Sequence, residues 1–204
     1  MGRISGRAAI QAAVKKYGGS GVDFFQLKND GDSAKVRLLH KNDEDLDLIL
    51  VHEVEVDGKK KYIECLEENC PFCSNANIGQ PFLRLFLSMY DYEEQKVKVW
   101  ERGTNMVNDL LGFFDEYGDF NNRPYKIVRH GVKGDKKTSY QLFPGDKLPF
   151  EEEFPNEDER PKAPDLYGKF VLQWTAEEMK NYIAGSAPVP QDRARGPKEN
   201  GPGF

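Results

Sequence analysis

Most of the chain between residues 22 and 147 alternates apolar and polar side chains with the two-residue period of a β-strand. The alternation is clear in DLILVHEVEV, at residues 47–56, and in KVKVWERG, at residues 96–103. The dipeptide Asp57-Gly58 lies between the first of these strands and KKKYIEC, and it is a strong signal of a tight hairpin. Further strands are expected in AKVRLLH, FLRLFLSMYDY, YKIVRHGV and TSYQLF. The pattern therefore predicts about six or seven short strands.

One longer helix is expected in NMVNDLLGFFDEYG, where Met106, Leu110 and Phe114 recur at helical spacing. Thr104 stands at the position of an N-terminal cap, and Gly118 stands where the helix should end. Short antiparallel strands with a single helix suit a small closed barrel, of which the OB-fold is one form. The predicted fold class is mainly β: an OB-fold barrel with a small inserted metal-binding lobe and a few short helices.

The regions around this core differ from it in composition. Residues 1–21 are basic and rich in helix-forming residues, which predicts an arm. Residues 148–166 are rich in proline and acidic residues and suggest a linker or a solvated flank. Residues 167–185 predict a short strand and a helix that starts at a Thr-x-x-Glu capping box. The tail at residues 186–204 has the composition of a disordered segment.

Charge is distributed unevenly, although the formal net charge is −5. Residues 123–137 carry six basic residues against one acid, whereas the acidic residues gather in EEEFPNEDER at residues 151–160. Binding of an anionic partner depends on the local potential, so this segregation favours nucleic acid despite the net charge. No apolar run of about 18 residues is present, so neither a membrane span nor a membrane partner is expected.

All three cysteines and one of the three histidines lie within HEVEVDGKKKYIECLEENCPFC. The N-terminus has no apolar core typical of a signal peptide, so we expect reducing cytosol, where clustered cysteines favour metal binding or redox chemistry over disulfides. His52, Cys65, Cys70 and Cys73 make a Cys₃His set that suits one structural Zn²⁺, because the hairpin turn returns His52 to the side of Cys65. Unmetallated core cysteines and a Cys-Pro-Phe-Cys thiol–disulfide oxidoreductase are the alternatives.

Aromatic residues alternate with cations on several predicted strands. Lys96, Lys98, Trp100 and Arg102 share one strand face, which is too polar for a protein core. Aromatic platforms in a cationic groove are how single-stranded nucleic acids are held. Phosphate loops, nucleophile elbows and zinc-protease motifs are all absent from the sequence, so we do not expect an enzyme.

Two stretches, FQLKNDGDSAKVRLLHKNDED and LILVHEVEVDGKKKYIECLEENCPFC, resemble the core of the single-stranded-DNA-binding, helix-destabilising proteins of T-even-type bacteriophages. The resemblance is clear over about residues 24–75 and looser over residues 82–143. It is carried by Arg37-Leu38-Leu39, Lys41-Asn42-Asp43, His52, Gly58-Lys59, Tyr62-Ile63-Glu64, Cys65 and Cys70-Pro71-Phe72-Cys73.

The resemblance implies a zinc-stiffened OB-fold that coats single-stranded DNA during phage replication, recombination or repair, in the cytoplasm of the infected bacterium. It also implies that the N-terminal arm contacts another copy of the protein. The family's long acidic tail is missing here, so the acidic run at residues 151–159, or the C-terminal segment, is the expected contact for replication proteins. As a hypothesis, that acidic run competes with DNA for the cleft. A zinc-containing protein-interaction module is the rival interpretation.

The residues that we expect to bind DNA are cations for the phosphates and aromatics for the bases. They are Lys35, Arg37, Arg84, Lys98, Arg102, Arg129, Lys136 and Lys137, with Phe82, Tyr90, Trp100 and Tyr140.

Overall fold

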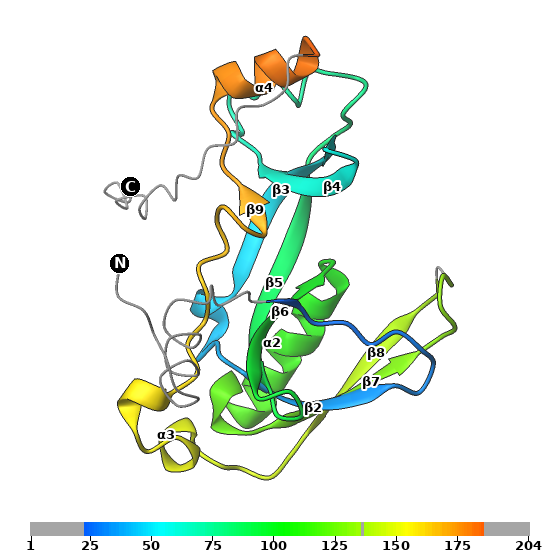
Figure 1. The fold of residues 1–204 in the computed structure, drawn as a ribbon. Coiled ribbons are helices and arrows are strands. Elements are labelled where there is room, and N and C mark those ends of the chain that lie inside the picture. Colours follow the sequence, from blue (N-terminus) through cyan, green and yellow to red (C-terminus); the bar gives the residue numbers. More distant parts are fainter. Residues whose placement is uncertain (1–22, 136, 186–204) are drawn as a thin grey trace, which may run out of the picture.

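The computed structural model describes residues 23–135 and 137–185, which form a mixed β-sheet with a few helices (Figure 1). The strands are β1 Asp23–Phe24, β2 Ser33–Leu38, β3 Asp47–Val56, β4 Lys59–Glu64, β5 Phe82–Asp91, β6 Lys96–Arg102, β7 Tyr125–His130, β8 Ser139–Pro144 and β9 Val171–Leu172. The helices are α2 Asn105–Tyr117, α3 Phe150–Glu153 and α4 Ala176–Ile183, with short 3₁₀ turns η1 Asp43–Asp45, η2 Phe120–Asn122 and η3 Glu157–Glu159. The expected basic arm, Lys136 and the expected tail lie outside the described residues.

The sheet order is β8-β7-β2-β5-β3-β4-β9, and β6 pairs with both β5 and β1. Strand β5 links two halves of the molecule, because its first half pairs with β3 and its last residues pair with β2. The mainly β class is therefore confirmed. Backbone pairing among the described strands does not join β8 to β9, so the sheet is not closed end to end. None of the helices in the described part has the length and apolar character of a membrane span.

The hairpin predicted at Asp57-Gly58 is confirmed. Strands β3 and β4 pair antiparallel, and Val56 faces Lys59 across the two-residue turn. Asp57 and Gly58 have φ angles of 52° and 70°, the left-handed pair that a type I′ turn requires. The turn fixes the register of the hairpin and thereby the place of His52 beside β4.

The predicted helix is also present, as α2. Its buried side chains are Met106 and Leu110, and it ends at Gly118, which has a φ of 73° and donates its amide to the Phe114 carbonyl at 2.8 Å. The predicted cap is wrong in one respect: Thr104 stands at the N-cap position, but its side chain makes no capping hydrogen bond. Its backbone is already helical, so its hydroxyl is not turned toward the free amides of the first turn.

Apolar residues gather in separate clusters at the two ends of β5. The larger cluster packs α2 and Trp100 against β2, β5 and β7. A smaller cluster at the other end surrounds Phe72 and includes Trp174 and Met179 from the C-terminal segment. That segment forms β9 and α4, as expected, and α4 starts at the Thr175–Glu178 capping box.

The acidic segment at residues 148–166 does more than link two regions. It forms α3 and η3, and its Leu166 is buried. Glu153 on α3 forms an ion pair with Arg37 and accepts a hydrogen bond from the Tyr92 hydroxyl at 2.7 Å. The segment is therefore packed against β2 and β5, while Glu151 and Glu152 remain exposed.

Candidate metal centre and candidate nucleic-acid interface

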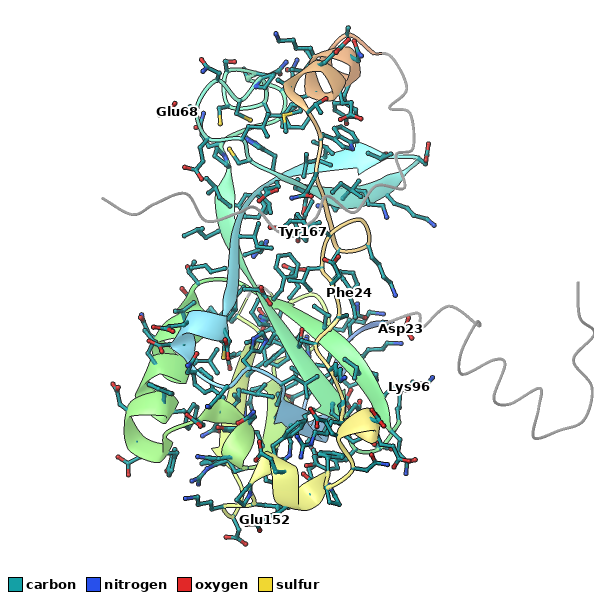
Figure 2. All side chains as sticks on the ribbon, turned by 90° about the vertical axis from the view of Figure 1, so that its left-hand side faces the viewer. Asp23, Phe24, Glu68, Lys96, Glu152 and Tyr167 are labelled. Atoms are coloured by element: carbon teal, nitrogen blue, oxygen red, sulfur yellow. The ribbon has the colours of Figure 1, made fainter. Side chains whose placement is uncertain are left out.

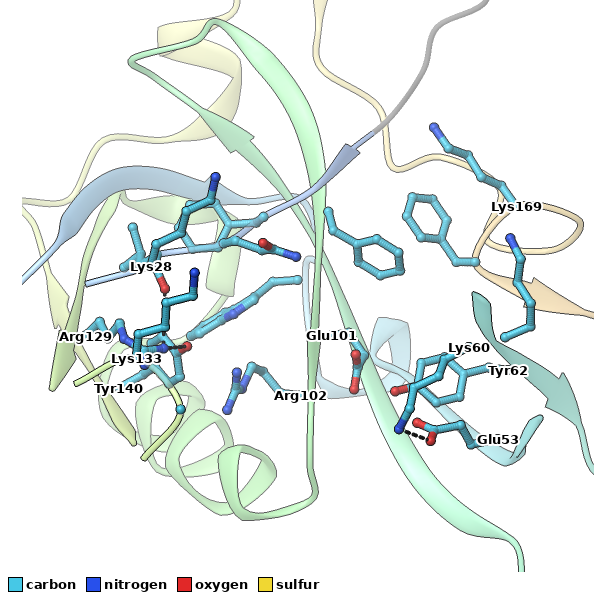
Figure 3. A pocket seen from close by; sticks show the side chains of 18 residues that line it. Lys28, Glu53, Lys60, Tyr62, Glu101, Arg102, Arg129, Lys133, Tyr140 and Lys169 are labelled. Atoms are coloured by element: carbon cyan, nitrogen blue, oxygen red, sulfur yellow. Dashed lines mark hydrogen bonds and ion pairs between the residues drawn. The ribbon is translucent and has the colours of Figure 1, made fainter. Parts of the chain in front are cut away.

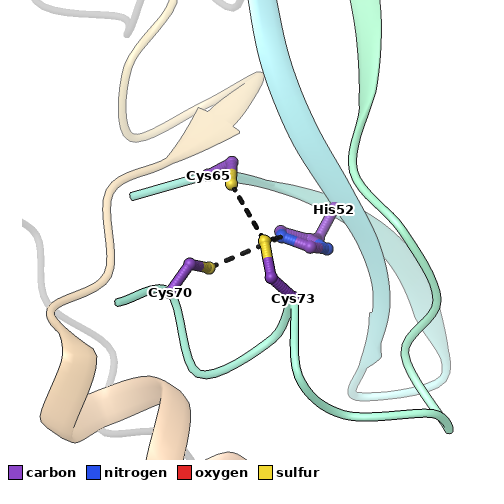
Figure 4. Close-up of side chains that lie close together, drawn as sticks. All are labelled: His52, Cys65, Cys70 and Cys73. Carbon is purple, nitrogen blue, oxygen red and sulfur yellow. Dashed lines mark hydrogen bonds between the residues drawn. The ribbon is translucent and has the colours of Figure 1, made fainter. Parts of the chain in front are cut away.

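The predicted ligands converge at one point (Figure 4). The four ligand atoms of His52, Cys65, Cys70 and Cys73 lie within 4.8 Å of one another. His52 Nε2 is 3.5 Å from the Sγ atoms of both Cys70 and Cys73, and Cys65 Sγ is 3.5 Å from Cys73 Sγ. These residues form a candidate metal centre.

Local structure explains why the ligands meet. His52 lies within β3, and Cys65 directly follows β4. The backbone amide of Cys65 donates a hydrogen bond to the Leu50 carbonyl of β3 at 2.8 Å. The chain then turns sharply through Glu67 and Asn69, which both have a φ of 58°. This turn brings the Cys-Pro-Phe-Cys loop back beneath the hairpin.

The spacing of the ligand atoms fits a tetrahedral ion. Zinc bonds of about 2.3 Å to sulfur and about 2.0 Å to nitrogen place two sulfurs about 3.8 Å apart and a sulfur about 3.5 Å from the nitrogen. All three cysteines are free, and a sulfur separation of 3.5 Å is far longer than a disulfide bond. The donor set also fits, because three sulfurs and an imidazole are the ligands typical of closed structural zinc sites.

Burial and backbone amides set the protonation of these groups. Burial raises the pKa of Cys65 to about 12. Burial also opposes ionisation of Cys70, but hydrogen bonds from three neighbouring backbone amides outweigh it and lower the pKa of that thiol. Burial lowers the pKa of His52, and a hydrogen bond with the Gly79 backbone opposes this shift to a smaller extent. The lowered pKa keeps the imidazole neutral, which a metal ligand must be.

The C-terminal segment covers the metal centre, which the sequence reasoning did not anticipate. Met179 of α4 places its sulfur 3.8 Å from Cys70 Sγ. Phe72 makes edge contacts with Trp174 and Tyr182 of the same segment, at 6.1 and 5.8 Å between ring centroids. Cys70 is thus buried against this segment, whereas Cys73 is partly exposed.

A cleft of about 570 Å³ lies between the two halves of the molecule (Figure 3). Seven of its lining residues are lysines or arginines and two are glutamates. One glutamate, Glu53, is paired with Lys60 at 2.6 Å, and the other, Glu101, is paired with Arg84 at 3.0 Å. Six aromatic residues also line the cleft: Phe24, Phe25, Tyr62, Trp100, Tyr140 and Phe170.

Four of the predicted DNA-binding residues line this cleft: Trp100, Arg102, Arg129 and Tyr140. Arg102 is half-buried and stacks over Tyr140, with its guanidinium carbon 4.2 Å from the ring centroid. Arg129 is buried and donates to the Tyr140 hydroxyl at 2.8 Å, so it holds that ring in place rather than reaching out to a ligand. Trp100 is 2% exposed and belongs to the core, so the face that looked too polar to be buried is in part a core face.

Two predicted phosphate contacts are corrected by their burial. Arg37 is fully buried, bound by Glu153 and donating to the carbonyls of Asn121 and Leu148 at 2.7 and 2.9 Å. Lys98 is buried and paired with Asp91 at 2.9 Å and with Glu94 at 2.7 Å. The sequence reasoning identified both as surface cations, but Arg37 compensates a carboxylate of the acidic segment and Lys98 compensates carboxylates of its own β5–β6 hairpin.

The remaining predicted residues lie outside the cleft lining. Arg84 stacks over Phe82, with its guanidinium carbon 4.7 Å from the ring centroid, and Tyr62 contacts the same ring. Tyr90 packs on Tyr92 and Phe154 at the acidic segment. Lys35 and Lys137 are exposed, and Lys35 lines a different groove.

Several lining residues were missed by the sequence reasoning. They are Phe24, Phe25, Lys28, Lys60, Lys61, Tyr62, Lys169 and Phe170. Phe24 is 43% exposed, and its ring contacts the ring of the buried Phe170 edge to face, with 4.8 Å between the ring centroids. Figure 2 shows Phe24, near the start of the described chain, close to the segment near its end that carries Tyr167. The lysine run at residues 59–61 was a visible signal, whereas nothing in the sequence connects Phe24 with Phe170.

No family model matches the chain, and a search of the curated proteins finds no match. The function is therefore argued from the metal centre and the cleft.

Proposed function

We propose that this protein binds and coats single-stranded DNA in the cationic, aromatic cleft and carries one structural zinc ion beside it. The observation that carries the proposal is the lining itself, where lysines and arginines outnumber carboxylates and where Phe24, Tyr62 and Tyr140 keep part of their side chains exposed. Cations attract the phosphates, and stacking on aromatic rings contributes about 1–3 kcal/mol per base without requiring a particular sequence.

The placement of charge favours a backbone that runs through the cleft. Lys28 and Lys133 lie on one side, while Lys60 and Lys169 come from β4 and the segment before β9 on the other. Arg102 lies between these sides, and its guanidinium stacks over the Tyr140 ring on the side of Lys133. A narrow site with aromatic platforms suits unpaired bases, because the bases of a duplex are already stacked on one another.

The metal centre supports the same site indirectly. His52, Cys65, Cys70 and Cys73 would hold Zn²⁺, which would supply a cross-link between the β3–β4 hairpin and the Cys-Pro-Phe-Cys loop. Strand β4 carries Lys60, Lys61 and Tyr62 to the cleft, so a stiff hairpin keeps one wall in place. The finer assignment of the sheet as an OB-fold, and a role in phage replication, recombination or repair, are part of this proposal.

The test is a titration of purified protein with a labelled single-stranded oligonucleotide and with the matching duplex, at several salt concentrations. We expect tight binding to the single strand, weak binding to the duplex and a strong decrease in affinity with salt. The variant Lys28→Ala/Lys133→Ala removes two exposed lining cations and should reduce the salt slope by about 0.7 for each lost phosphate contact.

The matched control is Lys41→Ala/Lys162→Ala, which removes two exposed lysines that do not line the cleft. It should leave the affinity and the salt slope at the wild-type values. An equal loss of single-strand affinity in both double variants would show that only the net charge matters, and it would contradict binding in the cleft. Zinc binding without any affinity for single strands would instead support the protein-interaction module.

A further inference from the structure

A second groove lies on the opposite face of the sheet from the cleft. Lys35 on β2 faces Lys126 on β7, and Lys126 faces Phe143 on β8, so the three side chains form one row across neighbouring strands. Arg129 and Tyr140, which line the cleft, are each three residues from a member of this row, and side chains three apart on a strand point to opposite faces. The β7–β8 hairpin therefore presents a different surface on each side.

The groove has an apolar floor and charged margins. Its volume is about 440 Å³, and its lining includes Pro124, Pro144 and Phe143, which is 43% exposed. Lys35 and Lys126 are exposed at its edge, and Glu93 is the acidic residue among those that line it. An exposed aromatic ring beside two proline rings offers a place for one apolar side chain of a ligand.

The two lysines are placed unfavourably for the isolated protein. Like charges directly opposite each other on neighbouring strands repel. The Lys35 ammonium lies 4.9 Å from the centroid of the Tyr92 ring, and within the described residues neither lysine is in an ion pair with a carboxylate. An anionic ligand that reached both ammonium groups would remove this repulsion.

We propose that this groove binds an acidic peptide segment of a partner protein, with one apolar residue of that peptide seated against Phe143 and carboxylates paired with Lys35 and Lys126. Charge complementarity and the apolar floor together select this occupant, because a peptide can place a single side chain between proline rings while its flanking acids reach the lysines. Lys35 then belongs to this groove and not to the DNA-binding cleft. The proposal is independent of the function proposed for the cleft.

The test uses a labelled synthetic peptide with a central phenylalanine between aspartates, titrated into the full-length protein and followed by fluorescence anisotropy. A peptide with alanine in place of the phenylalanine, and one with lysines in place of the aspartates, should bind more weakly. In the protein, Lys35→Glu/Lys126→Glu should weaken binding at least about tenfold, and Phe143→Ala should weaken it without changing its salt dependence. All three altered side chains are exposed, so each variant should fold, and its thermal unfolding curve provides the check.

Comparing two double variants with two ligands distinguishes binding in the groove from binding in the cleft. Lys35→Glu/Lys126→Glu should keep wild-type affinity for the single strand, while Lys28→Ala/Lys133→Ala should keep wild-type affinity for the peptide. The proposal is overturned if wild-type protein does not bind the acidic peptide, or if the groove variants bind it unchanged. It is also overturned if the groove variants lose single-strand affinity, which would assign the groove to nucleic acid. Self-association that these variants abolish would assign it to a second copy.

Discussion

Arg37 and Glu153 form an ion pair that fastens the acidic segment to β2, with the guanidinium fully buried. The same guanidinium donates to the Asn121 and Leu148 carbonyls and to the Tyr92 hydroxyl, so one side chain joins four segments of the chain. None of these residues lines the cleft. This relationship gives Arg37 a structural role and places Glu153 away from the proposed DNA site, which weakens the idea that Glu153 competes with DNA.

Replacing Arg37 by methionine should therefore destabilise the protein without acting on the cleft. The change leaves the Asn121 and Leu148 carbonyls without their donor and the partly buried Glu153 carboxylate without its counter-ion, which should lower the free energy of unfolding by about 2–4 kcal/mol. Chemical denaturation measures this loss. Glu151→Ala, an exposed neighbour of the pair, should change stability little. A folded Arg37→Met protein with reduced single-strand affinity would contradict the structural role.

Tyr140 should contribute to binding through its ring and not through its hydroxyl. Tyr140→Ala removes the surface on which Arg102 stacks and should weaken single-strand binding by about 1–3 kcal/mol. Tyr140→Phe keeps that surface and loses the hydrogen bond from Arg129, so its affinity should stay close to that of the wild type. Oligonucleotide titrations at one salt concentration compare the two variants, and equal losses would show that the ring is not a stacking platform.

Metal should be bound by the Cys₃His set and should stabilise the lobe around it. We expect elemental analysis to find about one zinc per chain, and Cys73→Ser to lose most of it, because a structural site needs all of its ligands. Amide hydrogen exchange should then increase in β4 and α4, which pack around the site. Ser74→Ala alters the next residue, which is exposed, and should retain the metal. Full metal content in Cys73→Ser would exclude this ligand set.

Alkaline pH should destabilise the protein through its buried tyrosines. Burial raises the pKa of Tyr125 to about 12, above its ordinary value of 10.0. As pH rises, the Tyr125 hydroxyl therefore loses its proton in the unfolded state before it does so in the folded state. The contribution of the buried hydroxyl to the free energy of unfolding is complete below pH 10 and is lost as pH rises toward 12. Tyr125→Phe should reduce the dependence of stability on pH in this window. At neutral pH it should cost little, because the buried Tyr125 hydroxyl has no hydrogen-bond partner. Denaturation curves across the alkaline range test both points.

Local sequence signals predicted the parts of this protein whose partners are close along the chain. The left-handed turn at Asp57-Gly58 needs only its two residues, and it fixes the register that brings His52 to Cys65. The Thr175–Glu178 capping box likewise acts within a single helical turn. Residue type and spacing along the chain are therefore enough to predict the candidate metal centre.

Strand alternation was less informative about the burial of cations and aromatic residues. It assigns side chains to the two faces of a strand but does not show which other segments cover each face. Lys98 and Arg37 stand at strand positions typical of surface residues, yet both are buried, because Asp91 on the neighbouring strand and Glu153 in the acidic segment neutralise them. Trp100 lies in a core that α2 and Phe25 complete. No spacing within one strand reports such distant partners.

The sequence by itself determined the mainly β class, the β3–β4 hairpin and the four residues of the candidate metal centre, since each depends on side-chain chemistry and backbone preferences over a few residues. Only the tertiary structure decided which cations remain exposed, that Phe24 meets Phe170 beside the cleft, and that α4 covers the metal centre. The physical reason is that burial and charge compensation are properties of the assembled surfaces, where segments more than a hundred residues apart supply each other's partners.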